Sequence, residues 1–282
     1  MNQFVKIIII LLVLISFSGC IRTKPEAIEG SRPYIDLPDE EPMTEAVVTK
    51  VIRPDLVEIQ DGSLVSLHYI SAPDKENFLY AEAVTRLEEL VLNKKIMLER
   101  EGRDKYPDSS YVRHIYADDK NAALVLVKEG YAEAPFARIY GERGEEFLEA
   151  ERQAKAQEIG IWEKSDYSSC IETVTWKHCG TAHGCGGNEE YLEFKNNCTF
   201  EIDLTNWSIR HGGRQAYKFK EFKLGFNESV RLYGGSGNDT SRELYLNGGY
   251  SEWASFCHIY IRDAEGKLVS DIVHCLAEYW ME

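Results

Sequence analysis

Apolar and polar residues alternate along several short segments between residues 45 and 117, and turn-forming residues separate these segments. A period of two is typical of a strand with one buried face. Two apolar runs flank the Pro54-Asp55 corner, and the dipeptide Asp61-Gly62 that follows is a typical hairpin turn. The pattern predicts consecutive antiparallel strands here, with two further strands at 96–101 and 111–117.

The apolar spacing changes to that of helices in three other segments. Over 79–95, apolar residues recur on one helical face, with Ala83 and Leu87 among them. A short helix is predicted within 121–134, and a longer one over 144–164, each closed by a glycine. The predicted order for residues 45–164 is therefore β-β-β-α-β-β-α-α.

From residue 191 to the C-terminus the chain shows only short alternating segments, with Gly and Asn between them. Regular short strands of this kind predict an all-β sandwich. We expect Trp207 to pack in its core, because a tryptophan within an alternating segment most simply fills the space between two sheets.

The first twenty residues have the layout of a secretory signal: one lysine, an apolar run too short for a good transmembrane span, and then Ser-Gly-Cys. This ending resembles a lipobox, in which the cysteine is lipidated, so Cys20 is the predicted lipid anchor; a plain signal peptide or short anchor is the alternative. Residues 21–44 are rich in proline and acids and are predicted to be a tether. The expected location is the cell membrane, facing outside the cytoplasm.

Six cysteines follow Cys20, and all lie after residue 169. Outside the cytoplasm an even number of cysteines favours disulfides, with fifteen pairings open. A Cys198–Cys257 bridge is the preferred pairing. The predicted linker, 165–187, also offers a zinc alternative, whose ligands would come from the group Cys170, His178, Cys179, His183 and Cys185.

The net charge is −15, and both predicted domains are acidic. Non-specific nucleic-acid binding depends on a basic surface, so this composition disfavours tight binding of DNA or RNA.

Five segments of residues 45–164 together resemble the staphylococcal nuclease (thermonuclease) family, which has an OB-fold β-barrel with helices. They are "VIRPDLVEI", "SLHYISAPD", "LYAEAVTRLEELV", "DKYPDSSYVRHIYADDKNAALVLVKEGYAEA" and "EAERQAKAQEIGIW". The resemblance implies a phosphodiesterase site with one Ca²⁺ held by carboxylates, a general base, and two arginines on the scissile phosphate.

Carried over position by position, that site is incomplete. Asp55 matches the first metal carboxylate, and Asp74 stands in place of the general-base glutamate. Ser71 occupies the position of the second metal carboxylate, Ser66 that of one arginine, and Ser109 or Ser110 that of the other. These losses predict a degenerate nuclease that needs no cofactor.

Three nearby side chains are candidates to substitute for the missing groups. His68 is two residues after Ser66 and so points to the same side of the strand, while Arg103 and Arg113 flank the second lost arginine. Ordinary barrel or surface roles for them are the alternative.

Residues 188–282 resemble the lamin-tail domain, an immunoglobulin-like sandwich, through "NEEYLEFKNNCTFEIDLTNWSIR", "LGFNESVRLYGG" and "IRDAEGKLVSDIV". This implies a binding module with an unknown protein or envelope partner. The leading hypothesis is thus a lipid-anchored binding or scaffolding protein. The alternatives are an anchored, Ca²⁺-dependent nuclease that retains Asp55 and Asp74, and a purely structural envelope protein.

Overall fold

The computed structural model describes residues 43–75, 78–135, 137, 141–177, 187–211, 214–247 and 258–273, all within one compact unit that spans 37–276. The predicted signal peptide, Cys20 and nearly all of the tether lie outside these residues. So do Cys257 and the four linker residues 178, 179, 183 and 185. Within the described ranges no helix is long and apolar enough to cross a membrane.

Residues 44–121 form a closed five-stranded barrel, with one further short strand at its edge. The strands are β1 (Thr44–Arg53), β2 (Leu56–Ile59), β3 (Leu64–Leu67), β4 (Lys95–Glu99), β5 (Tyr111–Ala117) and β6 (Lys120–Asn121). They pair in the order β3-β2-β1-β4-β5-β6, and a parallel pairing between β3 and β5 closes the ring. This barrel fits the predicted OB-type architecture.

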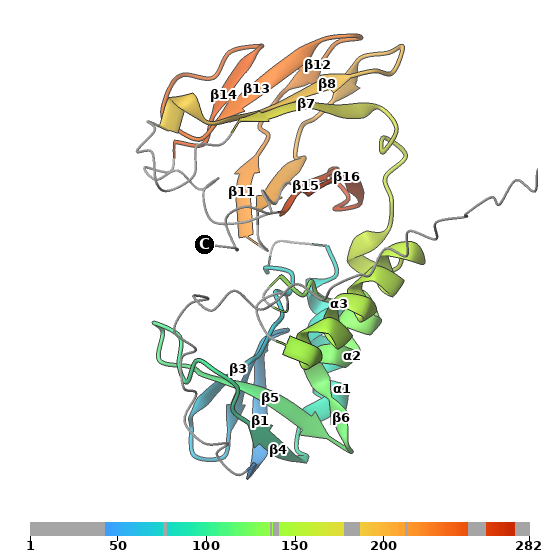
Figure 1. The fold of residues 1–282 in the computed structure, drawn as a ribbon. Helices are drawn as coiled ribbons and strands as arrows, with labels where there is room; N and C mark the ends of the chain where they lie inside the picture. The colour runs from blue at the N-terminus through green and yellow to red at the C-terminus, as the bar shows by residue number, and fades with distance from the viewer. Residues whose placement is uncertain are drawn as a thin grey trace, which may run out of the picture. The chain divides into compact units, whose positions relative to one another are not determined.

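Three helices accompany the barrel, gathered on one side of it in Figure 1. They are α1 (Tyr80–Val91), α2 (Ala122–Lys128) and α3 (Gly141–Ala156), and a 3₁₀ turn, η2 (Gly160–Trp162), follows them. Helix α1 buries Ala83, Leu87 and Val91, the face that the spacing predicts. It ends four residues earlier than expected, because Leu92 is extended and Asn93 takes a positive φ of 58° before β4 begins.

The N-terminus of α2 shows how the sequence fixes a helix boundary. Asn121 has extended backbone geometry, and its side-chain oxygen accepts hydrogen bonds from the N–H groups of Ala123 and Leu124. These are two of the donors that a first turn leaves unsatisfied. Asn121 is itself buried and belongs to β6, which pairs with β5, so the cap joins α2 to the barrel sheet.

The C-terminal β-region, residues 171–273, contains two four-stranded sheets and a two-stranded one. The sheet orders are β11-β10-β15-β16, β14-β13-β8-β7 and β12-β9. The strands are β7 (Ile171–Lys177), β8 (Tyr191–Asn196), β9 (Ile202–Asp203), β10 (Ser208–His211), β11 (Arg214–Lys218), β12 (Lys223–Leu224), β13 (Ser229–Tyr233), β14 (Glu243–Tyr245), β15 (His258–Arg262) and β16 (Leu268–Val273), with a short 3₁₀ turn, η3 (Gly187–Glu189), before β8.

Both large sheets contribute to one apolar core. Leu192 and Leu232 come from one sheet, Ile209 and Ile261 from the other, and Trp207 packs among them, almost completely buried. The prediction of Trp207 as a core residue is confirmed. Strands β13 and β14 run parallel to each other, whereas the other strand pairs among the described residues of this region are antiparallel.

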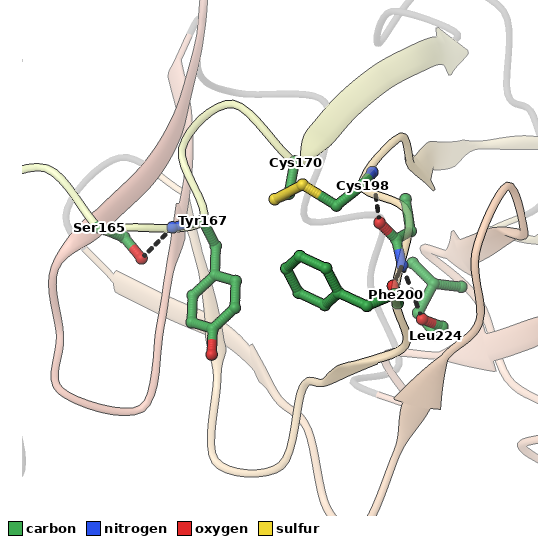
Figure 2. Close-up of a disulfide and its surroundings, with 7 residues drawn as sticks. Ser165, Tyr167, Cys170, Cys198, Phe200 and Leu224 are labelled. Atoms are coloured by element: carbon green, nitrogen blue, oxygen red, sulfur yellow. Dashed lines mark hydrogen bonds between the residues drawn. A yellow bond between two sulfur atoms is a disulfide. The ribbon is translucent and has the colours of Figure 1, made fainter.

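The predicted Cys198–Cys257 bridge is wrong, because Cys198 is bonded to Cys170, just before β7 (Figure 2). The backbone explains the pairing: Asn197 N–H donates to the Cys170 carbonyl, and Asn196 Oδ1 accepts from Cys198 N–H. The Asn196 amide also donates to the carbonyls of Phe200 and Leu224. This side chain therefore fixes the loop that carries Cys198.

Candidate functional site

The family-derived positions come from three parts of the barrel. Asp55 lies in the turn between β1 and β2, and Ser66 lies in β3. Ser71 and Asp74 follow β3, and Ser110 directly precedes β5. Because β3 and β5 pair in parallel, the structure brings Ser66 and Ser110 together, although 44 residues separate them.

The two serines form a buried hydrogen-bonded pair. Their hydroxyl oxygens are 3.0 Å apart, and the residues are 4% and 0% exposed. The Ser110 hydroxyl donates to Asp108 Oδ1 at 2.7 Å, so the Ser66 hydroxyl is left as the donor to Ser110. The hydrogen bonds that Asp108 accepts from the hydroxyl and the N–H of Ser110 hold the pKa of this carboxyl below its ordinary value. Two neutral groups thus lie at the positions that the resemblance assigns to the arginines, and Ser110, not Ser109, is the buried residue.

Asp55 is paired with Arg53, the last residue of strand β1. Its Oδ1 accepts a hydrogen bond from Arg53 Nε at 2.9 Å. Burial disfavours the charged form of Arg53, but the hydrogen bond to Asp55 and the nearby charges of Asp55 and Asp108 outweigh this and raise its pKa. In the aligned segment, Arg53-Pro54-Asp55 stands where the family pattern has Asp-Gly-Asp. A positive side chain therefore replaces an acid beside the metal position.

The loop after β3 is held by backbone pairing. Ser71 and Glu133 exchange both N–H···O=C bonds, at 3.0 and 2.9 Å. Asp74, half exposed, accepts a hydrogen bond of 3.3 Å from Arg210 Nη2 of strand β10. Sequence reasoning missed Arg53, Glu133 and Arg210. Only Arg53 had a sequence signal, namely its position in an otherwise acidic motif.

These residues do not fit a calcium site. Calcium takes six to eight oxygen ligands, several of them carboxylates. Here Asp55 is neutralised by Arg53, and a serine stands at the second carboxylate position. In the described part of the chain, no group of three or more His, Cys, Asp or Glu side chains is arranged to hold a metal ion.

The three candidate substitutes, Arg103, Arg113 and His68, each contact other residues of the barrel domain. Arg113 donates to Asp104 Oδ1 at 2.6 Å, and Arg103 lies over the Tyr106 ring. His68 is only 3% exposed and contacts the rings of Tyr69 and His114, at centroid distances of 4.3 and 5.0 Å. These contacts agree with the alternative that the three side chains have ordinary barrel or surface roles.

His68 belongs to a buried polar network inside the barrel. His114 Nε2 lies 2.9 Å from Glu101, and Glu101 also accepts from Arg143 at 2.8 Å. Burial disfavours the Glu101 carboxylate, but its bonds to His114 and Tyr69 and the Arg143 charge outweigh this and lower its pKa to about 2. Burial, followed by the charge of His114, lowers the pKa of His68 to about 3. Both histidines of this network are buried inside the barrel and do not face solvent.

The fold and these positions define a nuclease-like barrel joined to a strand-rich C-terminal region. Residues 64–164 match the family model of staphylococcal nuclease homologues. The chain is also 30% identical, over 115 residues, to an uncharacterized endonuclease of Haemophilus influenzae; the match covers 40% of this chain and 59% of that protein. The chain therefore contains a staphylococcal nuclease-like domain and spans well under two thirds of the length of this relative.

Proposed function

We propose that this protein is a surface-anchored lipoprotein whose nuclease-like barrel serves in binding or scaffolding and does not catalyse. The anchor would be a lipid on Cys20, and the location would be the cell membrane, outside the cytoplasm. The C-terminal β-region would act as a lamin-tail type, immunoglobulin-like interaction module toward a protein or envelope partner. The buried hydrogen bond between Ser66 and Ser110 carries the non-catalytic assignment.

The energetic argument rests on charge. Phosphoryl transfer needs fixed cations where negative charge develops, and loss of one such donor typically costs about 3–4 kcal/mol. Two losses correspond to a rate reduction of roughly 10⁴–10⁵ or more, although such effects are not strictly additive. The serine hydroxyls also satisfy each other and Asp108, so they are committed to the barrel and not to a ligand.

The second candidate is an anchored, Ca²⁺-dependent nuclease acting on DNA or RNA. The family match and the name of the Haemophilus relative favour it, as does the presence of Asp55 and Asp74 at two site positions. The ion pair of Asp55 with Arg53 and the acidic net charge of −15 oppose it.

One assay separates the two. The full-length protein in mild detergent is incubated with single-stranded DNA and with RNA, with and without millimolar Ca²⁺. We expect no metal-dependent cleavage. Ca²⁺-dependent cleavage that is abolished by both Asp55→Ala and Asp74→Ala would refute the non-catalytic assignment. Metabolic labelling with a fatty acid, compared between the wild type and Cys20→Ser, tests the anchor: label that persists in the variant contradicts it.

A further inference from the structure

Asp74 and Arg210 join two parts of the compact unit that are 136 residues apart in sequence. The Arg210 side chain is only 4% exposed, and that of Asp74 is 55% exposed. A guanidinium this deeply buried requires an anionic partner, because removing its charge from water is costly. Asp74, which stands at the general-base position, thus faces a fixed cation of the C-terminal β-region.

A second acidic residue of the barrel lies beside this pair. Glu133, almost completely buried, is held next to Ser71 by the two backbone hydrogen bonds described above, and its Oε1 lies 3.9 Å from Arg262 Nη2. The Arg262 guanidinium also donates to the carbonyls of Ile161 and Gly266. Two carboxylates of the barrel therefore face two arginines of strands β10 and β15.

Apolar and backbone contacts continue the same surface. Trp162 packs edge-to-face on Tyr260 at a centroid distance of 5.6 Å, in a small core cluster that also contains Ala154, Ile161 and Leu268. Leu268 N–H donates to the Glu163 carbonyl, and Ser165 N–H donates to the Leu268 carbonyl. Lys155 of α3 bonds to Asp271 of β16 at 2.9 Å.

Gly266 lies against Phe78 with no room for a side chain. It has a positive φ of 89°, and a Cβ atom added there would lie 2.3 Å from Phe78 Cβ, a distance that real side chains do not reach. The pocket lined by Ser71, Glu133, Arg210 and Arg262 has a volume of about 20 Å³, which is room for roughly one water molecule. Pockets for small ligands are typically about 300–1,000 Å³. A nucleotide therefore does not fit between these residues.

We propose that Asp74 and Glu133 form the acidic half of an intramolecular docking site on the barrel. The partner is the C-terminal β-region, which covers the loop after β3 through Arg210 and Arg262. The proposal rests on the proposed function in one respect, that Asp74 is not a catalytic base. It assigns a structural role to an acid that family resemblance places in the active site.

The test measures hydrogen exchange of the full-length protein in mild detergent, at the amides of Ser165 and Leu268. Each of these amides donates across the docking surface, so separation of the two parts exposes both. We expect Asp74→Asn to accelerate this exchange by about two- to fivefold, the range for a partly exposed ion pair. Asp55→Asn is the matched control, because that carboxylate is paired within the barrel, with Arg53 at the end of β1, and its loss should leave the exchange unchanged.

Glycine substitutions provide an independent variant pair. Gly266→Ala should accelerate the exchange of Ser165 and Leu268 by roughly tenfold or more, because the new methyl group collides with Phe78. Gly62→Ala introduces the same unfavourable backbone geometry, with φ of 82°, but nothing lies within 4 Å of the added Cβ. It should not affect these two amides.

The outcomes are distinct. Unchanged exchange in both Asp74→Asn and Gly266→Ala overturns the docking site, and so does an equal acceleration in the two control variants. The cleavage assay on the same proteins is read separately: loss of a nuclease activity in Asp74→Asn refutes the non-catalytic assignment. If exchange is also unchanged in that variant, Asp74 is a base and not a docking residue, and both proposals fall.

Discussion

Replacement of His68 by leucine should alter the pH dependence of stability more than stability itself. The His68 ring is buried among Tyr69, His114 and the Glu101–Arg143 pair, and burial lowers its pKa to about 3, against 6.5 for an exposed histidine. The folded protein thus holds His68 neutral down to pH 3, whereas the unfolded chain takes up a proton below pH 6.5. Since the unfolded state binds more protons in this window, stability falls as pH falls from about 6.5 toward 3.

The magnitude follows from the size of the shift. Each pKa unit corresponds to about 1.36 kcal/mol, so the contribution lost between pH 6.5 and pH 5 is about 2 kcal/mol, and the whole window accounts for nearly 5 kcal/mol. His68→Leu removes the titrating ring and keeps an apolar side chain of similar size at a buried position.

The assay is urea unfolding of wild type and His68→Leu between pH 5 and pH 8, followed by far-ultraviolet circular dichroism. The stability difference at pH 8 reports packing alone, because His68 is then neutral in both states. We expect the variant to gain about 2 kcal/mol relative to the wild type between pH 8 and pH 5. A difference that stays constant with pH would refute the buried neutral ring, and a change of opposite sign would mean that the folded state protonates it.

Two further predictions test the docking surface and the disulfide. Burial raises the pKa of Glu133 to about 7, so the folded state retains a proton that the unfolded chain releases above about pH 4.5. The free energy of unfolding should therefore fall by about 3 kcal/mol as pH rises from 4.5 to 7. Denaturant unfolding of Glu133→Gln should lack this pH dependence, and the same pH dependence in both proteins contradicts the prediction. The Cys170–Cys198 bond spans 28 residues and should contribute about 3–4 kcal/mol by restricting the unfolded chain. A reductant should therefore lower the melting temperature of the wild type more than that of Cys170→Ala/Cys198→Ala, and an equal response in both proteins contradicts the pairing.

Local periodicity was sufficient for the barrel elements. The segment predicted as a strand at 111–117 forms β5 over Tyr111–Ala117, with burial that alternates except at the adjacent buried pair His114 and Ile115, and the apolar face of α1 is the one that the spacing predicts. The helix boundary was less predictable, because Asn93 ends α1 through a left-handed backbone conformation that no apolar pattern encodes. Strand pairing in the C-terminal β-region was also beyond local signals: nothing in the sequence indicates that β13 and β14 run parallel.

The sequence singled out residues of the candidate site, but it did not indicate which residues they bond to. The resemblance singled out Ser66 and left Ser109 or Ser110 open, and only the parallel pairing of β3 with β5 shows that Ser66 and Ser110 bond to each other. The pairing of Cys198 failed because fifteen connectivities were open and sequence spacing does not encode distance. Arg210 was missed for the same reason, since 136 residues separate it from Asp74.

The pattern of substitutions has a physical logic that links the two proposals. A calcium ion needs several carboxylate oxygens as ligands, and a reacting phosphate needs fixed cations, so the groups of such a site must be available to bind them. In this protein Asp55 is paired with Arg53, Asp74 with Arg210, and the serine pair with Asp108, so each position finds its partner within the chain. Adding a metal or a phosphate would require breaking one of these contacts. Restoring a single arginine at Ser66 would therefore not recreate the site, because the carboxylates would remain committed to their present partners.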